Sequence, residues 1–345
     1  MHKSAKDGDM DKTKISIKIK VLAALCLLLL VFLAGLFTGV NYHKLNNGRR
    51  NLLETMRIKG YKFTSPLLDY EAGPEIKDKV LVFLKYKIEK LIESRTRNDD
   101  AIYVSVYFRD MFNGPWFGIN EKENFAPASL LKVPLMIAYL KYAEQDPGIL
   151  KSRLVYEKEF KNDVVQNIIP AEKLELGGSY SVEELIERMI KHSDNSAMYL
   201  LLGNISADVI NKVYSDIGII VPSVRGKSDF ITVKGYSSFF RILFNASYLN
   251  REMSEKALEI LSKSTFKSGL AAGVPDDVVI AHKFAERGDL VTQTFQLHDC
   301  GIVYHRKRPY LLCIMTYGKD FRPLSKIIRD ISSLVYEDID SHYNK

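Results

Sequence analysis

Ser129 and Lys132 are the first two residues in this sequence whose types and spacing could do chemistry together. They lie three positions apart in the segment ASLLK (128–132), and a helix brings residues at this spacing onto one face. A serine hydroxyl is a weak nucleophile without a base, and a lysine is a base only if burial or a neighbouring positive charge lowers its pKa. The pair alone is weak evidence, because a serine at a helix start near a solvated lysine is a common pattern.

Two further polar clusters follow in the order that such chemistry would need. Ser193-Asp194-Asn195 lies between two stretches with helical periodicity, and all three residue types are also favoured at helix N-caps. Lys283 lies within HKFA (282–285), at the end of a predicted strand, where a lysine is unusual as a core residue. Each cluster has a simple structural explanation, but the order and spacing of all three do not.

The three clusters together resemble the signature of the penicillin-recognising serine enzymes, which comprise class A serine β-lactamases and D,D-peptidases. That signature is S-x-x-K, then S-D-N, then a K-T-G-like strand. The resemblance runs from about Ile76 to Tyr336. It includes FAPASLLKVPL around Ser129, MIKHSDNSAMYLLL around Asn195 and the closing segment CGIVYHRKRPYLLCIMT. It implies a serine acyl-enzyme mechanism that uses neither a metal ion nor a cofactor.

The resemblance also implies a role for each site residue. Ser129 would be the acyl-accepting nucleophile and Lys132 its base, while Ser193 would relay a proton to the leaving nitrogen. Asn195 would bind the amide side chain of the substrate, and Lys283 would add positive charge for its carboxylate. The backbone N–H groups of Ser129 and Glu286 would form the oxyanion hole.

The third motif departs from the family pattern. Phe284 stands where the family usually has a Thr or Ser hydroxyl, and Ala285 stands where it has Gly. Lys267-Ser268-Gly269 spells the family tripeptide, but it follows a predicted helix and precedes a Gly/Pro-rich turn. The chemistry needs a strand edge facing Ser129, so we favour Lys283 over Lys267 as the site lysine.

Deacylation is the second departure, because class A β-lactamases use a Glu on a loop after S-D-N to activate water. Between Gly218 and Thr232 this chain has no Glu, and Asp229 is the single carboxylate. Asp229 could substitute, although an N-cap ahead of the next helix is the interpretation that we favour. The sequence therefore predicts acylation followed by slow release.

Strands are expected near both ends of the domain, with helices between them. A long amphipathic helix is predicted over 74–97, and a closing helix over 322–336. The expected strands are 101–109, 116–119, 278–284, 290–297, 301–304 and 310–316, and the expected central helices are 130–143, 182–192, 197–202, 207–217, 233–246 and 254–261. This order predicts an α+β fold, in which N- and C-terminal strands share one antiparallel sheet flanked by a mainly helical subdomain.

Residues Val21 to Val40 form an uncharged run of 20 residues, which matches the hydrocarbon core of a bilayer, about 30 Å thick. The run exceeds the apolar region of a usual cleaved signal peptide. We therefore expect a cytoplasmic tail over 1–20, a transmembrane anchor over 21–40, a juxtamembrane stalk over 41–73 and the β-lactamase-like domain over 74–345. The expected location is the cell membrane, with a single pass and the catalytic domain outside.

Composition excludes several other classes of protein. The chain is 46% hydrophobic and 26% charged, which is ordinary for a folded protein. Its formal charge of +7 is spread through the sequence, and the sequence has no zinc-finger spacing, so no nucleic-acid partner is expected. Three cysteines exclude a disulfide framework. Cys300 and Cys313 flank a predicted hairpin, where two reduced core residues are the favoured interpretation and a bridge is the alternative.

These observations favour a membrane-anchored serine hydrolase that attacks an amide, either a β-lactam or a cell-wall peptide, through a Ser129 acyl-enzyme. A D,D-carboxypeptidase or penicillin-binding protein remains open, because the loop Glu is missing. A non-catalytic domain that binds β-lactam or peptidoglycan also remains open, because Phe284 and Ala285 replace family residues.

Overall fold

The computed structural model describes residues 79–111, 114–160, 173–220, 228–289 and 291–343, together with residues 32, 35, 62–64 and 168. The chain divides into two compact units, residues 1–58 and 59–345, and the fold below is that of the second unit. The predicted tail and anchor lie outside the described residues, apart from Phe32 and Gly35. Among the described residues, no helix combines the length and apolar character needed to cross a bilayer.

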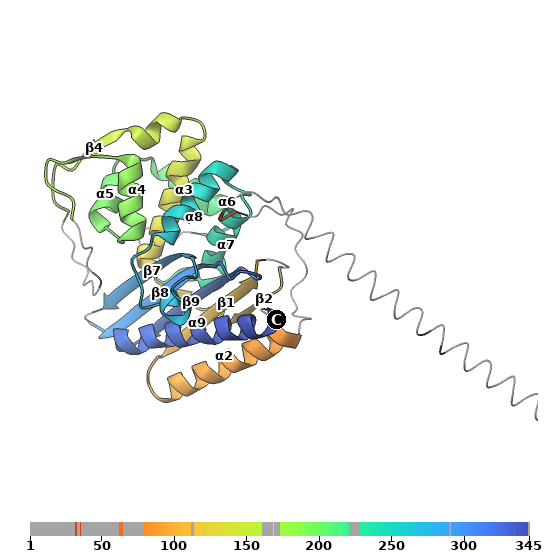
Figure 1. Cartoon of the computed structure of the whole chain (residues 1–345). Coiled ribbons are helices and arrows are strands. Elements are labelled where there is room, and N and C mark those ends of the chain that lie inside the picture. The colour runs from red at the N-terminus through yellow and green to blue at the C-terminus, as the bar shows by residue number, and fades with distance from the viewer. Residues whose placement is uncertain are drawn as a thin grey trace, which may run out of the picture. The chain divides into compact units, whose positions relative to one another are not determined.

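A five-stranded antiparallel sheet forms the centre of this unit, with strand order β2-β1-β9-β8-β7 (Figure 1). Its strands are β1 (Tyr103–Asp110), β2 (Trp116–Ile119), β7 (Ile280–Asp289), β8 (Thr294–Val303) and β9 (Tyr310–Gly318). β1 pairs with β9 from Tyr103 opposite Tyr317 to Asp110 opposite Tyr310. The N- and C-terminal strands therefore share one sheet, which confirms the predicted α+β arrangement.

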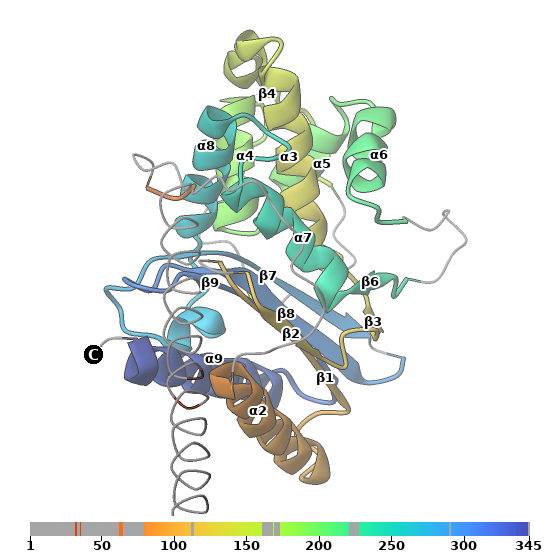
Figure 2. The same cartoon turned by 90° about the vertical axis from the view of Figure 1, so that its right-hand side faces the viewer.

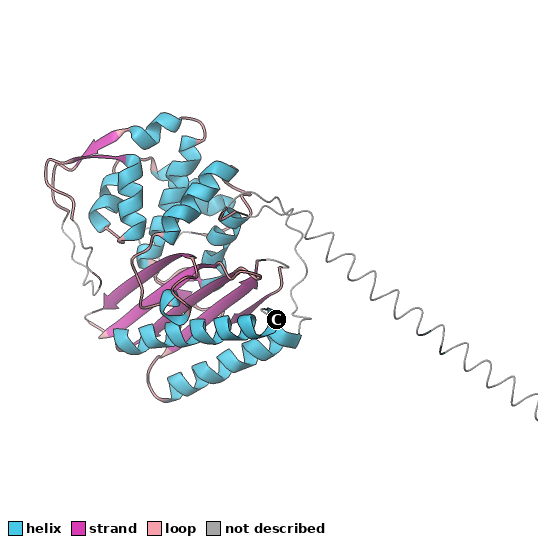
Figure 3. Ribbon diagram, in the orientation of Figure 1, coloured by secondary structure: helices cyan, strands magenta, loops and turns pink. Residues whose placement is uncertain are grey.

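Helices cover both faces of the sheet (Figures 1 and 3). On one face lie the long helices α2 (Lys79–Arg97) and α9 (Phe321–Tyr343), with the short helix η3 (Leu270–Gly273) packed against α9. The remaining helices make up the other layer, which Figure 2 shows from a second side. They are η1 (Ala128–Leu131), α3 (Lys132–Ala143), η2 (Pro147–Lys151), α4 (Val182–Lys191), α5 (Asn195–Leu202), α6 (Ala207–Asp216), α7 (Val233–Phe244) and α8 (Arg251–Ser262).

Two hydrophobic clusters, one on each face, hold these layers together. Leu84, Ile88, Phe108 and Ile328 are fully buried in the cluster under α2 and α9. The larger cluster joins the helical layer to the opposite face of the sheet. The alternation of strand side chains between the two clusters explains why these strands read as nearly continuous apolar runs.

The structure contains strands that the sequence reading missed. β3 (Asn124–Phe125) pairs with β6 (Ile231–Thr232), and β4 (Arg153–Val155) pairs with β5 (Ser179–Ser181), so the expectation that strands resume only after the helices was wrong. The segment Arg287–Asp289, which lies between the expected strands 278–284 and 290–297, continues β7 and pairs with β8. β8 is likewise one strand rather than two, because His298 and Asp299 are buried polar residues with hydrogen-bond partners.

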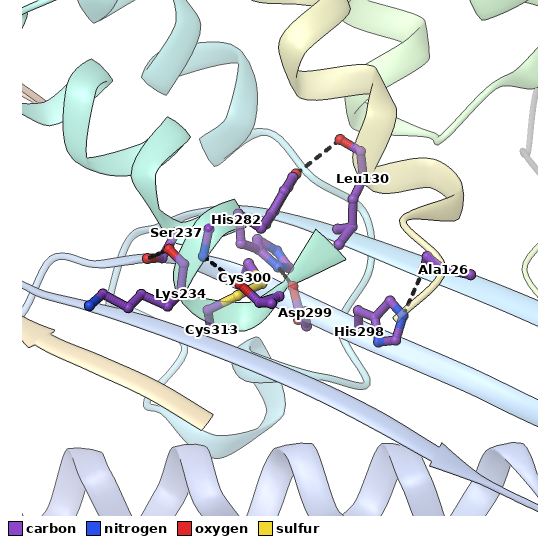
Figure 4. The surroundings of a disulfide bond; sticks show 12 residues. Ala126, Leu130, Lys234, Ser237, His282, His298, Asp299, Cys300 and Cys313 are labelled. Carbon is purple, nitrogen blue, oxygen red and sulfur yellow. Dashed lines mark hydrogen bonds and ion pairs between the residues drawn. A yellow bond between two sulfur atoms is a disulfide. The ribbon is translucent and has the colours of Figure 1, made fainter. Parts of the chain in front are cut away.

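Cys300 and Cys313 form a disulfide between β8 and β9 (Figure 4). They lie directly opposite each other in the strand register, at the hairpin position that the sequence predicted. The favoured expectation of two reduced cysteines was therefore wrong, since the register brings the two Cα atoms to 3.9 Å.

Part of the predicted stalk is docked on the domain. The backbone N–H groups of Phe63 and Thr64 each donate to one carboxylate oxygen of Glu255 on α8, both at 2.8 Å. The Tyr304 hydroxyl donates to the carbonyl of Phe63 at 3.1 Å, and the two rings meet edge to face. We call residues Lys62–Thr64 the docked strap.

Candidate active site

Ser129 lies in the short helix η1, immediately before α3, with its side chain half-buried. The preceding residue, Ala128, has a positive φ of 44°, a conformation that costs free energy for a residue with a Cβ. The Tyr236 hydroxyl donates to the carbonyl of Leu130 at 3.1 Å. The local backbone around the serine is therefore strained and held in place by a buried side chain from α7.

A second support fixes the chain just before η1. Gln296 Oε1 accepts from the Ala126 N–H at 2.9 Å, and His298 Nε2 donates to the Ala126 carbonyl at 3.1 Å (Figure 4). Burial lowers the pKa of His298 to about 4, so that the ring is neutral and Nε2 carries the proton. These two residues of β8 therefore fix the position of the backbone that leads into η1 and Ser129. Sequence reasoning missed them, although polar residues at alternate positions of an apolar strand were a signal.

The S-D-N segment enters the site through another left-handed residue. Ser193 has a φ of 56° and is buried. Asp194 caps the N-terminus of α5, accepting from Ser196 N at 2.8 Å and from Ala197 N at 3.2 Å. The cap explains the Asp, and it turns the flanking Ser193 and Asn195 toward Lys132, which contacts both.

Lys132 is fully buried at the centre of these groups. Its Nζ lies 3.0 Å from Ser129 Oγ, 3.0 Å from Ser193 Oγ, and 2.6 Å from both the Ser193 carbonyl and Asn195 Oδ1. The last two atoms can only accept, so they take two N–H groups. A neutral amine has two N–H groups and one lone pair, which leaves that lone pair for a hydroxyl proton.

Burial lowers the pKa of Lys132 from its ordinary value to about 7, while the negative charge of Asp194 acts in the opposite direction. At neutral pH a substantial fraction of this lysine is therefore unprotonated. This meets the requirement that a lysine must be desolvated before it can act as a base toward Ser129.

Lys283 projects from the edge strand β7 and is also fully buried. Its Nζ donates to Ser193 Oγ at 3.0 Å and to the Phe284 carbonyl at 2.8 Å. Burial, and secondarily the charge of Lys132, lower the pKa of Lys283 well below its ordinary value. The structure thus brings four of the predicted side chains together around Lys132: Ser129, Ser193, Asn195 and, through Ser193, Lys283.

The two unusual residues of the third motif are both buried. Phe284 stacks on Phe266 with ring centroids 4.3 Å apart, and Ala285 is fully buried. Neither supplies a hydroxyl for a substrate carboxylate. Lys267, the alternative site lysine, is exposed and lines a different cavity.

Glu286 lies three residues beyond Lys283 on the same strand, and η1 packs against this strand. Its carboxylate is engaged, since Oε1 accepts from Ile168 N at 2.9 Å. An edge strand has backbone groups that are not used by the sheet. An oxyanion hole built from the N–H groups of Ser129 and Glu286 stays a prediction.

Asp229 does not cap the following helix, because Thr232 takes that position and accepts from Gly235 N at 3.0 Å. The N-cap interpretation of Asp229 was therefore wrong. Its carboxylate accepts from Gln296 Nε2 at 3.0 Å and lies 3.7 Å from Arg287. These contacts occupy the single carboxylate of the shortened loop. Across the part of the chain that the structure describes, no group of three His, Cys, Asp or Glu side chains could hold a metal ion.

The arrangement of an antiparallel sheet, a helical layer and a Ser–Lys pair facing an edge-strand lysine is that of the penicillin-recognising serine enzymes. The model of the β-lactamase enzyme family matches residues 84–339, so the chain belongs to that family. A comparison with curated proteins finds no match.

Solved structures show the same fold at low sequence identity. One is a mutant of PBP-A in an acyl-enzyme complex with penicillin-G, with 20% identity, 76% of this chain and 97% of that chain covered, and a TM-score of 0.63. Another is a β-lactamase from Chitinophaga pinensis DSM 2588, with 18% identity, 74% and 98% covered, and a TM-score of 0.64. A third represents the class A β-lactamases of Bacteroides cellulosilyticus DSM 14838, with 20% identity, 75% and 99% covered, and a TM-score of 0.63.

Proposed function

We propose that this protein is a serine hydrolase that forms an acyl-enzyme at Ser129 with a β-lactam or a cell-wall peptide. The observation that carries the proposal is the environment of Lys132, whose buried amine lies 3.0 Å from Ser129 Oγ with a pKa near 7. A merely structural lysine would be expected to stay charged and solvated.

In the acylation step, Lys132 Nζ accepts the proton of Ser129 while Oγ bonds to the carbonyl carbon. The carbonyl oxygen becomes negative and is received by backbone N–H groups. The C–N bond then breaks, and the leaving nitrogen takes a proton from Ser193 Oγ, which Lys132 reprotonates across 3.0 Å. The net result is the transfer of one proton from Ser129 to the departing nitrogen, with Lys132 and Ser193 returned to their starting protonation states.

Lys283 supports this transfer in two ways. It donates to Ser193 Oγ, which favours the negative charge that develops there when the hydroxyl gives up its proton. A substrate carboxylate that approaches Lys283 would raise the pKa of this amine and draw a proton onto it. Binding of the substrate carboxylate would thereby change the protonation state of Lys283.

Hydrolysis of the acyl-enzyme is the slow step of the proposal. No Glu is present between Gly218 and Thr232, and Asp229 is bound to Gln296. General-base help to an attacking water is typically worth about 10²- to 10⁴-fold. The adduct is therefore expected to accumulate, as in a penicillin-binding protein of the D,D-carboxypeptidase type.

A non-catalytic binding domain is the second candidate, and the burial of Phe284 favours it because the usual hydroxyl for a substrate carboxylate is missing. Such a domain would bind the same ligands without a covalent bond. The two candidates differ in whether Ser129 is modified.

The deciding experiment is intact-mass spectrometry of the full-length protein after mixing with benzylpenicillin. A mass increase equal to the whole drug, absent in Ser129→Ala, is expected. Reversible binding that is equal in both proteins, without any mass increase, would instead establish the binding domain.

We also propose that residues 21–40 anchor the protein in the cell membrane with the domain outside. The uncharged stretch of 20 residues supports the anchor. Protease treatment of intact cells should remove the domain, and survival of the full-length chain would contradict the proposed orientation.

A further inference from the structure

A cavity of about 470 Å³ lies at the N-terminal end of β7, and none of the residues around Lys132 lines it. Its size is within the range of small-molecule sites. Its wall combines charged and apolar side chains from the docked strap, α8, η3 and the segment before β7: Lys62, Ser262, Lys267, Ala271, Val274, Pro275, Asp276, Val278, Val279, Ile280 and His282.

His282, which lines the cavity, forms a buried hydrogen-bonded pair with Asp299. His282 is only 1% exposed, and its Nδ1 lies 2.8 Å from Oδ1 of Asp299, which is fully buried (Figure 4). The other carboxylate oxygen accepts from Leu270 N at 2.8 Å. Asp299 thus holds Nδ1, and Nε2 has no hydrogen-bond partner among the described residues. This nitrogen is the polar atom that His282 can offer to a ligand.

Two glycines make room for the pair. A Cβ on Gly301, which lies opposite His282 in the sheet, would come within 2.3 Å of the His282 Cβ. A Cβ on Gly269 would come within 2.3 Å of Asp299 Oδ2. The local backbone therefore accommodates this orientation of the imidazole, which the Asp299 contact then fixes.

The docked strap contributes the second polar side of the cavity. Its two hydrogen bonds to Glu255 hold Phe63 and Thr64 on α8, and Lys62 directly before them lines the cavity. Lys267 lines it from the segment before η3. Asp276 is the single carboxylate in the wall, so the two lysines leave a net positive charge.

We propose that this cavity binds a small organic anion with an apolar body, such as an aryl-alkyl carboxylate. Lys62 and Lys267 receive the carboxylate, and His282 lies in the wall of the same cavity. The side chains of Val274, Val278 and Ile280 cover the apolar part. The site requires the docked strap, because Lys62 belongs to it.

The probe is 3-phenylpropionate, titrated by calorimetry into the full-length protein in a non-ionic detergent. Saturable binding is expected in the native chain. Lys267→Gln and Lys62→Gln should each weaken it by about ten-fold, since each removes a charge-assisted hydrogen bond. Lys234→Gln is the matched control, because Lys234 lies over the Trp116 ring beside β2, at the opposite edge of the sheet. It should leave the affinity unchanged.

Two further ligands define the chemistry and its source. The neutral 3-phenylpropanamide should bind at least about ten-fold more weakly than the acid. Benzylpenicilloate carries the same kind of carboxylate and would be the product of the proposed hydrolysis. If benzylpenicilloate binds and Lys267→Gln weakens its binding, the cavity retains the product of the proposed hydrolysis. If only 3-phenylpropionate binds in this Lys267-dependent way, the natural ligand is a different carboxylate. Both results support the site.

Three outcomes would overturn the proposal. They are an absence of saturable binding at millimolar concentrations, equal affinity in Lys267→Gln and Lys234→Gln, and equal affinity for the acid and the amide. The measurement needs no catalytic turnover. Its failure is therefore distinguishable from a failure of Ser129 to acylate.

Discussion

Lys132 and Lys283 share one hydrogen-bond partner, since the Nζ atom of each lies 3.0 Å from Ser193 Oγ. Both amines are fully buried, and two positive charges so close together in a dry site repel strongly. The charge of Lys132 lowers the pKa of Lys283 for this reason. The pKa of Lys132, lowered by burial to about 7, leaves a base available in the neutral pH range.

The first prediction concerns the pH dependence of acylation. Lys132 has a pKa lowered to about 7, so its unprotonated fraction falls about ten-fold for each pH unit below that value. The acylation rate with a fluorescent penicillin, measured by stopped flow, should fall in the same way below pH 7. Lys132→Met, which keeps the side-chain length without the amine, should lose acylation at every pH. A pH–rate curve whose decrease is centred near the ordinary pKa of lysine would contradict a buried base.

Asp229→Asn should leave release of the acyl group unchanged within about two-fold, because Gln296 and Arg287 already occupy this carboxylate. The measurement is the decay of the adduct in intact-mass spectra after free drug is removed. A decrease of about 10²-fold in the release rate would identify Asp229 as the base that activates water.

His298 should make the free energy of unfolding depend on pH between about 4 and 6.5. Burial lowers the pKa of His298 in the folded protein to about 4, so between these pH values the unfolded chain binds a proton that the folded chain does not bind. The resulting loss of stability is absent above pH 6.5 and reaches about 3 kcal/mol near pH 4. Urea unfolding of native protein and His298→Gln across this window tests it, and the two should respond differently. Parallel curves would exclude His298 as the source.

The disulfide between Cys300 and Cys313 predicts one reactive thiol in the protein unfolded without reductant, and three after reduction. Replacing both cysteines by Ala should lower the free energy of unfolding by about 3 kcal/mol, since the bridge closes a short loop of the unfolded chain. Three thiols before reduction would contradict the bridge.

The sequence predicted the parts of the site that depend on local spacing. Ser129 and Lys132 are three residues apart, and the helical turn formed by η1 and the start of α3 places Lys132 Nζ 3.0 Å from Ser129 Oγ. The strands β1 and β9 were predictable from their β-branched and aromatic residues, with bounds correct to about two residues.

The supports of the site were not predictable, because they join residues far apart in the chain. The contacts of Gln296 and His298 with Ala126 span 170 and 172 residues. Nothing local marks Ser193 for a positive φ, since a Ser has no intrinsic preference for that region. His298 and Asp299 fall between the expected strands 290–297 and 301–304, whereas in the structure they have tertiary hydrogen bonds and belong to the continuous strand β8.

The docked strap also limits how far the domain can travel from its predicted anchor. From Val40 to the start of α2 the chain has 39 residue steps, which could extend to about 130 Å. With Phe63 and Thr64 held by Glu255, the 22 residue steps from Val40 to Lys62 span about 75 Å at most. Release of the docked strap from Glu255 and Tyr304 would raise the maximum length of chain between the predicted anchor and the domain from about 75 to about 130 Å.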